Sequence, residues 1–113
     1  MTEKIAVGLT EKVKLVGKEQ SEEYIARIDT GATKSSIDLA LASRLQLGPI
    51  TRSRMIKSAH GSKLRPVVEV TIEIQGKPMR AEFTLADRSH MRYRILIGQN
   101  ILRNGFIIDP TKK

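Results

Sequence analysis

Cysteine and tryptophan are both absent from this 113-residue sequence, and phenylalanine and tyrosine occur only twice each. Without cysteine the chain has no disulfide and no thiol nucleophile. At 4% aromatic residues, it also has few of the rings on which single-stranded nucleic acids stack. These absences exclude thiol catalysis and disfavour one large class of nucleic-acid binding.

Long apolar runs are absent as well, so no membrane partner is expected. The start of the chain, Met1-Thr2-Glu3-Lys4, lacks the apolar block of a secretory signal. Together with the absence of cysteine, this favours a cytoplasmic protein. The length suffices for one modest core, and we expect a single domain over residues 1–113.

Acidic residues are scarce, with 12 Asp and Glu against 20 Lys and Arg, which gives a net charge of +8. Three interpretations compete: a surface that is simply basic, an acidic peptide as substrate or partner, or nucleic acid. No zinc finger, RNA-recognition motif or recognition helix is visible, so nucleic acid is the least favoured. The cations that would concentrate a polyanionic substrate fall in two stretches, Arg52, Arg54, Lys57, Lys63 and Arg65, and then Arg88, Arg92 and Arg94.

Alternation of apolar and polar side chains dominates the chain and predicts mostly strands. Short helices are expected at 38–47 and 99–103, and Met55 and Met91 are expected to fill the core. Many short strands separated by turn signals predict an all-β fold, a small closed barrel or sandwich with one or two short helices. The expected strands cover residues 4–9, 12–16, 24–28, 51–58, 63–74, 79–85, 95–98 and 106–109.

One motif interrupts this pattern. Asp29-Thr30-Gly31 follows an expected strand and occurs only once. A carboxylate at the end of a buried strand is costly unless it is hydrogen-bonded or shared, and Gly31 lets the backbone approach it closely. An ordinary turn would also use Asp and Gly. The alternative is half of an aspartic protease site, which a second copy of the chain would complete.

A second segment strengthens the protease interpretation. Ile95-Leu96-Ile97-Gly98 is an apolar strand that ends at glycine, and Gln99-Asn100-Ile101-Leu102 then begins a helical turn in which Asn100 is expected to make structural hydrogen bonds. The segment begins 66 positions after Asp29. The order and spacing of the two motifs are more specific than either motif alone.

Together the two motifs resemble those of retropepsin-like aspartic proteases, in which an Asp-Thr-Gly loop precedes an apolar-apolar-Gly-Arg-Asn/Asp-apolar-Leu segment. More narrowly, the chain resembles the RimK-associated, RimB-like family, also labelled "ATP-dependent zinc protease". That family carries Asp-Arg, Met, a short basic or aromatic link and Leu-Ile-Gly-Arg, and it closes on Gly-apolar-apolar-Val-Asp. The similar segments in this chain are 85–98 and 104–110.

The resemblance implies a small closed retropepsin-like barrel and a homodimer. Asp29, Thr30 and Gly31 would form the catalytic loop, with Thr30 bracing it across the dimer axis. Asp29 and its symmetry mate would share one proton, so that one carboxylate activates a water while the other polarises the scissile carbonyl and protonates the leaving amine. A mobile hairpin with its tip at residues 59–62 would close over the peptide. The positions expected to contact substrate are Ala32, Thr33, Lys34, Ala59, His60 and Gly61.

Three positions depart from the retroviral pattern. Gln99 stands where retroviral proteases have Arg, and Thr33 stands where they have Asp. Because both partners of that salt bridge are missing together, no charge is left unpaired. Lys34 then puts a cation where those enzymes place an acid. We therefore expect an acidic peptide substrate, and a glutamate-rich one, because the resembled family is often found beside a ligase that adds glutamates.

No metal and no cofactor are expected, despite the zinc and the ATP in one family label. The only histidines are His60 and His90, no His-Glu-x-x-His is present, and zinc needs three or four suitable ligands. The chain also lacks a glycine-rich phosphate-binding loop for ATP.

Two other functions stay open on the sequence alone. A non-catalytic dimerisation or peptide-binding module would keep the retropepsin-like fold, although it has no physical need for a buried carboxylate pair. A basic nucleic-acid-binding β-barrel would bind DNA or RNA with a steep dependence on salt, and this binding would survive Asp29→Ala.

Overall fold

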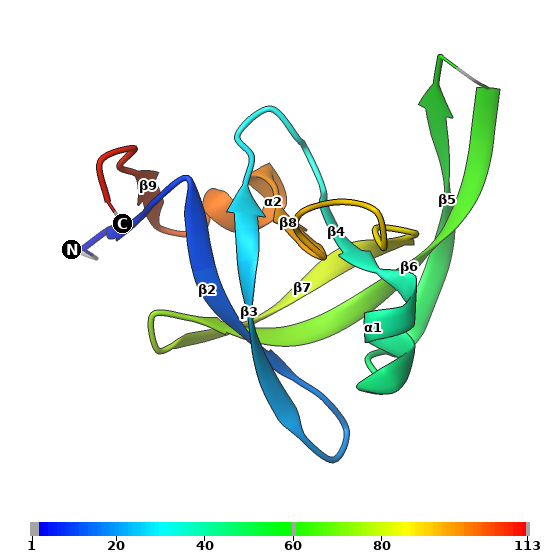
Figure 1. Cartoon of the computed structure of the whole chain (residues 1–113), viewed down its shortest axis with the longest axis horizontal. Helices are drawn as coiled ribbons and strands as arrows, with labels where there is room; N and C mark the ends of the chain where they lie inside the picture. The colour runs from blue at the N-terminus through cyan, green and yellow to red at the C-terminus, as the bar shows by residue number, and fades with distance from the viewer. Residues whose placement is uncertain (1–2, 60, 113) are drawn as a thin grey trace.

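The structure is a computed structural model, and it describes residues 3–59 and 61–112. These residues form strands of different lengths and two short helices (Figure 1). The strands are β1 (Ile5–Val7), β2 (Thr10–Val16), β3 (Ser21–Ile28), β4 (Ser35–Asp38), β5 (Ile50–Ser58), β6 (Gly61–Ile74), β7 (Lys77–Ala86), β8 (Ile95–Ile97) and β9 (Phe106–Ile108), and the helices are α1 (Leu39–Arg44) and α2 (Gln99–Leu102).

The main sheet closes on itself. Its strands run in the order β2-β3-β8-β4-β7-β6, and β6 pairs back with β2 to complete a six-stranded barrel. β5 pairs only with β6, and the two strands continue beyond the barrel as a long hairpin that rises at the upper right of Figure 1. A closed barrel leaves few exposed strand edges, which explains why a chain with so many short strands can form a stable sheet.

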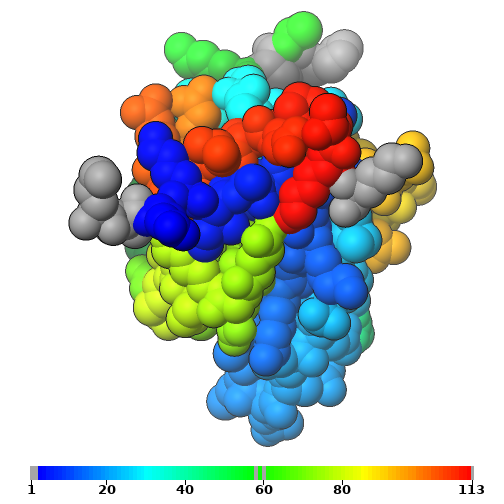
Figure 2. Space-filling model, turned by 90° about the vertical axis from the view of Figure 1, so that its left-hand side faces the viewer, coloured from blue at the N-terminus to red at the C-terminus, as the bar shows by residue number. Residues whose placement is uncertain are grey.

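β1 and β9 form a separate two-stranded parallel sheet, so the two ends of the described chain meet. Figure 2 shows these ends side by side, next to the turn between β6 and β7. Side chains tie the three segments together, because Gln75 Nε2 and Lys112 Nζ both donate to the carbonyl oxygen of Ala6, at 2.7 and 3.0 Å.

The predicted alternation builds the core. In β2 the side chains of Val13 and Leu15 are fully buried, and in β6 the side chains of Ile72 and Ile74 are buried in the same alternating way. The all-β barrel with two short helices is therefore confirmed. No helix among the described residues is long and apolar enough to span a bilayer.

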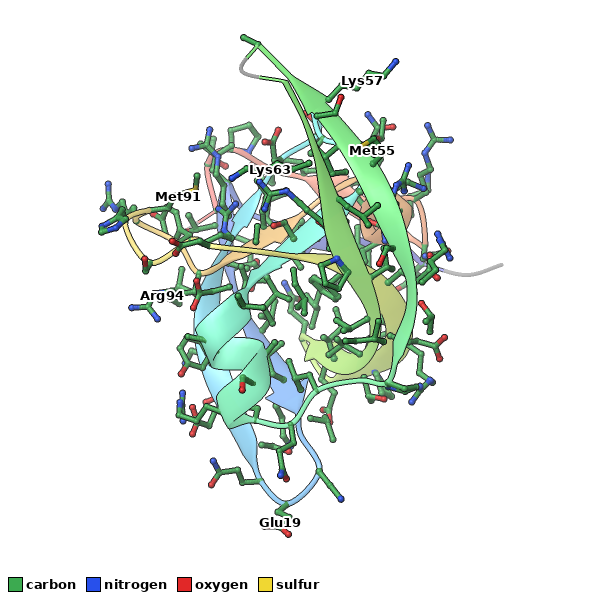
Figure 3. All side chains as sticks on the ribbon, turned by 90° about the vertical axis from the view of Figure 1, so that its right-hand side faces the viewer. Glu19, Met55, Lys57, Lys63, Met91 and Arg94 are labelled. Carbon is green, nitrogen blue, oxygen red and sulfur yellow. The ribbon has the colours of Figure 1, made fainter. Side chains whose placement is uncertain are left out.

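Three parts of the prediction were wrong. β4 was not predicted, because Ser35-Ser36-Ile37-Asp38 has too little alternation to stand out, and its strand pairing comes from β7 and β8 on either side. The first helix ends at Arg44 rather than at residue 47. Met55 and Met91 do not fill the core, since their exposed fractions are 58% and 55%. Both project from the molecule in Figure 3, Met55 on the hairpin and Met91 on the loop before β8.

A buried carboxylate joins β4 to the loop that precedes β8. Asp38 is only 1% exposed, and it caps α1 by accepting from the Leu41 N–H at 3.2 Å. Its other oxygen accepts from the Arg88 N–H at 2.8 Å, and its own N–H donates to the Arg94 carbonyl. The Arg94 guanidinium lies 3.7 Å from the carboxylate. Asp38 therefore holds both ends of the 88–94 loop.

We predict that Asp38→Ala lowers the free energy of unfolding by about 3 kcal/mol, because it removes a helix cap and leaves the buried Arg88 N–H without an acceptor. Urea unfolding of the two proteins measures the difference. Asp87→Ala is the control, because Asp87 is exposed and bonds only to nearby Ser89, so its loss should cost less than about 1 kcal/mol. Equal losses in the two variants would contradict the role of Asp38.

Candidate active site

The candidate catalytic carboxylate, Asp29, comes directly after β3 and is half-buried. Its N–H donates to the Ile97 carbonyl of β8 at 2.9 Å, so the end of β3 is fixed against the neighbouring strand. Its Oδ1 accepts from the Gly31 N–H at 2.9 Å, and its carbonyl accepts from the Ala32 N–H at 3.2 Å. The Gly31 and Ala32 N–H groups thus hold the loop together.

The loop after Asp29 is held by the segment that crosses over it, β8 to α2. A Cβ on Gly98 would lie 2.2 Å from the Lys34 carbonyl oxygen and 2.8 Å from that of Ala32, so only glycine allows this approach. The next two backbone N–H groups donate into the loop, from Gln99 to the Ala32 carbonyl at 2.8 Å and from Asn100 to the Thr33 carbonyl at 3.2 Å.

A buried hydroxyl and an amide support this crossing. The Ser35 hydroxyl is fully buried, accepts from the Gly98 N–H at 2.9 Å and donates to Asn100 Oδ1 at 2.7 Å. Asn100 Nδ2 donates to the Glu82 carbonyl of β7 at 3.0 Å. The expected structural hydrogen bonds of Asn100 are confirmed, and they tie the crossing to a third strand.

Gln99 occupies the position at which retroviral proteases have arginine, and its side chain makes two hydrogen bonds there. Its side-chain Nε2 donates to the Thr30 carbonyl at 2.7 Å, and its Oε1 accepts from Arg103 at 2.9 Å. The Thr30 hydroxyl has no hydrogen-bond partner within the described chain, and Thr30 is exposed. A neutral amide therefore braces the Asp29 loop and leaves the Thr30 hydroxyl available.

The positions predicted to contact substrate fall into two groups. Ala32, Thr33 and Lys34 belong to the Asp29 loop, and the side chains of Thr33 and Lys34 are exposed. Ala59 and Gly61 lie at the exposed tip of the β5–β6 hairpin. His60 lies outside the described residues. Figure 1 shows the hairpin tip and the loop after β3 at the same end of the molecule, as a flap would require.

The hairpin carries like charges face to face. Arg54 lies directly opposite Arg65, and within the described residues neither has an ion-pair partner. Arg52 is different, since its guanidinium makes two bonds to the Glu82 carboxylate, at 2.6 and 2.8 Å. Like charges directly opposite one another destabilise a strand pair, so Arg54 and Arg65 do not stabilise this hairpin through their charges.

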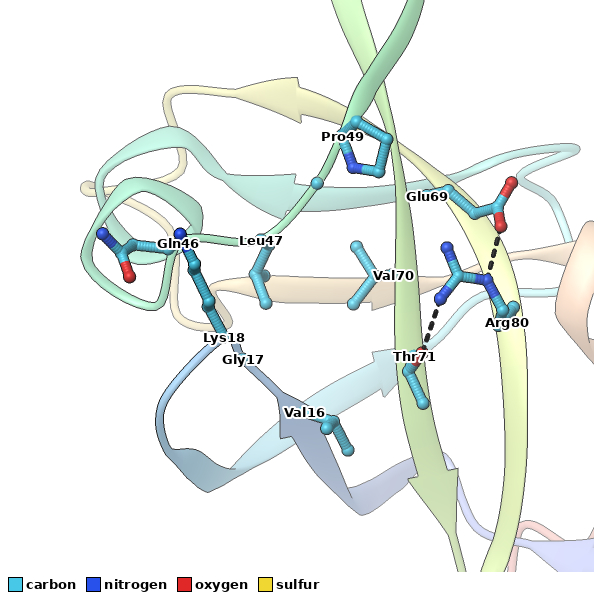
Figure 4. Close-up of a pocket in the computed structure, with 11 residues that line it drawn as sticks. Val16, Gly17, Lys18, Gln46, Leu47, Pro49, Glu69, Val70, Thr71 and Arg80 are labelled. Carbon is cyan, nitrogen blue, oxygen red and sulfur yellow. Dashed lines mark hydrogen bonds and ion pairs between the residues drawn. The ribbon is translucent and has the colours of Figure 1, made fainter.

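One cavity lies away from Asp29. It has a volume of about 590 Å³ and lies between the segment that follows α1 (46–49), the end of β2 and the strands β6 and β7, and no residue of the Asp29 loop lines it (Figure 4). Two of the charged side chains that line this cavity bond to each other, since Arg80 pairs with Glu69, and Arg80 also donates to the Thr71 hydroxyl. Elsewhere in residues 3–59 and 61–112, no three His, Cys, Asp or Glu side chains gather in a way that could hold a metal ion.

A second cavity, of about 560 Å³, adjoins the Asp29 loop through Ile28. Sequence reasoning grouped Arg88 and Arg92 only as a basic stretch and missed that Arg27 joins them here. It also missed the role of Asp38, whose carboxylate holds the 88–94 loop that carries Arg88 and Arg92. The one available signal was the alternation of β3, which turns Arg27 outward while Ile28 faces the core.

Comparison with known proteins supports the fold. The family model described as "RimB-like: Retropepsin-like aspartic endopeptidase RimB" matches residues 41–113. Among solved structures, a Legionella pneumophila protein of unknown function has a TM-score of 0.67 at 21% identity, covering 96% of this chain and 95% of that one. The protease of EIAV, complexed with an inhibitor, has a TM-score of 0.67 at 22% identity, covering 92% and 93%.

A curated relative places the sequence in a longer context. A probable alpha-L-glutamate ligase of Shewanella pealeana is 32% identical to 77% of this chain, and the match covers 24% of that protein. The chain therefore spans about a quarter of the length of this curated relative. The Asp29 loop, its crossing glycine, the barrel and the match over residues 41–113 agree, and the chain belongs to the RimB-like family of retropepsin-like aspartic endopeptidases.

Proposed function

We propose that this protein is a homodimeric aspartic endopeptidase, with Asp29 of each copy supplying one carboxylate to a shared site. The observation that carries the proposal is the construction of the Asp29 loop. A half-buried carboxylate is held by the Gly31 N–H at 2.9 Å, and the loop is fixed by the close crossing at Gly98. The chain has one such loop, so a pair of carboxylates requires two copies.

The chemistry follows from two carboxylates at short range. Like charges that close cannot both ionise cheaply, so the pair holds one proton. The ionised Asp29 takes a proton from a water, which attacks the scissile carbonyl. The protonated Asp29 gives its proton to the carbonyl oxygen, which forms a tetrahedral diol. The first Asp29 passes the proton from water to the leaving amine, the C–N bond breaks, and the second Asp29 takes a hydroxyl proton back from the diol, so the pair again holds one proton. We propose that the Thr30 hydroxyl, which has no partner within the described chain, braces the Asp29 loop of the other copy.

The proposed substrate is an acidic peptide, and a glutamate-rich one in particular. Support comes from the net charge of +8, from exposed Lys34 within the Asp29 loop, and from Arg54 and Arg65 on the hairpin, for which the described residues offer no ion-pair partner. The relatives named probable alpha-L-glutamate ligase add a chemical link, because such a ligase and a peptidase for glutamate-rich chains would act on the same class of molecule. We also propose that the chain acts as a single domain in the cytoplasm.

We predict that Asp29→Asn lowers peptide hydrolysis by about a thousandfold or more, because an amide neither activates a water nor shares a proton. Cleavage of a glutamate-rich peptide library by wild type and variant, read by mass spectrometry, measures the loss. Sedimentation should find the same dimer for both proteins, and a chelator should leave the wild-type rate unchanged.

Glu19→Gln is the matched control, since it makes the same carboxylate-to-amide change at the turn between β2 and β3, at the opposite end of the molecule (Figure 3). It should keep full activity. A folded dimer that cleaves no peptide would sink the peptidase proposal and favour a peptide-binding module. Salt-sensitive binding of DNA or RNA that persists in Asp29→Ala would favour the nucleic-acid alternative.

The contact between Gln99 and Thr30 gives a second prediction. In Gln99→Glu a carboxylate oxygen replaces the Nε2 donor and faces the Thr30 carbonyl oxygen, so the loop should lose its brace and kcat should fall roughly tenfold or more. Gln75→Glu is the control, because it removes the same kind of bond, from an amide to the Ala6 carbonyl, at the β6–β7 turn. Steady-state kinetics and thermal unfolding should show similar stability losses but a kcat loss only for Gln99→Glu. An unchanged kcat would rule out the positioning role.

A further inference from the structure

The cavity of about 560 Å³ beside the Asp29 loop has an apolar lining on several sides. Ile28, which directly precedes Asp29, forms part of the wall, and Tyr93 forms another part. Leu9 and Met91 also line it, and their exposed fractions of 56% and 55% are large for apolar side chains. A large open cavity with exposed apolar walls next to a reactive group is the usual form of a ligand site.

Three arginines complete the lining, and no carboxylate is among the described residues that face this cavity. Arg88 is 8% exposed, and its Nε donates to the Tyr93 carbonyl at 3.0 Å. Burial lowers the pKa of Arg88, the charge of Asp38 opposes this effect, and nearby Arg27 adds to the lowering. The cavity therefore gathers positive charges that act on one another.

The other two arginines lack acidic partners. Within the part of the chain that the structure describes, no carboxylate lies within 4.0 Å of the guanidinium of Arg27 or of Arg92. Arg92 lies over the Tyr93 ring, 5.5 Å from its centre, so its guanidinium stays near the cavity wall. Other arginines do pair with acids, as Arg44 does with Glu22 and Arg80 with Glu69. The described residues that line this cavity include three arginines and no acid, so the guanidinium groups of Arg27 and Arg92 are available to an acidic ligand.

We propose that this cavity binds the carboxylate of one acidic side chain of the substrate peptide, and that Arg27 and Arg92 determine this specificity. The inference rests on the proposed endopeptidase function and assigns a position to its acidic preference. A guanidinium matches a carboxylate with two parallel hydrogen bonds, and the apolar walls suit the methylenes of a glutamate side chain. A single aromatic ring offers no stacking platform for successive bases, which favours a peptide over a nucleic acid.

The test uses pairs of peptides, one pair for each position around the cleaved bond. The two peptides of a pair differ only at that position, where one has Glu and the other has Gln. Wild type should favour Glu at one position by roughly tenfold to a hundredfold in kcat/KM, the range of hydrogen bonds to charged groups. The double variant Arg27→Gln, Arg92→Gln should lose this preference, measured as the ratio of kcat/KM for the Glu peptide to kcat/KM for the Gln peptide. Both side chains are exposed, so the fold should survive, and circular dichroism checks it.

Arg54→Gln, Arg65→Gln is the matched control. It also removes two arginine charges, but from the hairpin and not from the cavity. It should lower kcat/KM for all acidic peptides by a similar factor and should leave the positional preference intact. If the hairpin double variant loses the preference and the cavity double variant keeps it, the assignment of the cavity is overturned. Arg27→Glu should go further and favour Lys over Glu at the same position.

A binding measurement separates this inference from the peptidase proposal. Asp29→Asn, labelled with ¹⁵N, is titrated with a glutamate-rich peptide and with its glutamine counterpart. Shifts of the Thr10, Arg27 and Met91 amides with the Glu peptide alone support the cavity even if wild type cleaves nothing. Shifts confined to residues 51–65, equal shifts with both peptides, or tighter binding of a single-stranded oligonucleotide at the same amides would each overturn it.

Discussion

The close approach of Gly98 to the loop between β3 and β4 is the contact on which the candidate site depends. Two carbonyl oxygens, of Ala32 and Lys34, occupy the space that a Cβ would need, at 2.8 and 2.2 Å. Because the two segments lie this close, consecutive N–H groups of Gln99 and Asn100 reach carbonyls of the loop. The position of Asp29 is therefore set by main-chain contacts that any larger residue at 98 would separate.

Neutral groups complete this arrangement. Three uncharged groups make hydrogen bonds where the β8–α2 segment crosses the loop after β3. The Ser35 hydroxyl bonds to the Gly98 N–H and to the Asn100 amide, and the Gln99 amide bonds to the Thr30 carbonyl. A buried ion pair needs excellent geometry to offset the loss of hydration, whereas neutral hydrogen bonds need only satisfied partners. Because Gln99 is an amide, the group that braces the Thr30 carbonyl is itself uncharged.

Local sequence patterns were sufficient for the parts of this fold with strong alternation. β3, β6 and the Gly98 segment could be predicted because apolar positions and turn residues mark them. β4 could not, because its strand state comes from pairing on both sides. The role of Asp38 was equally hidden, since its partners at Arg88 and Arg94 lie some fifty positions away and no local pattern relates them. The expected catalytic role of Asp29 stays a prediction.

Two pairs of arginines, neither with an ion-pair partner among the described residues, differ in what they can contribute to the binding of an acidic substrate. Arg54 and Arg65 lie on a hairpin that projects into solvent, where salt screens their charge and long-range attraction is the main effect. Arg27 and Arg92 share a cavity with nearly buried Arg88, where charges are less screened and hydrogen bonds are directional. The hairpin therefore suits the capture of acidic chains in general, and the cavity suits the choice of which acidic residue lies beside Asp29. Attraction of acidic chains is thus assigned to the hairpin, and selection of one acidic residue is assigned to the cavity. Salt should therefore weaken the attraction by the hairpin more than the selectivity of the cavity.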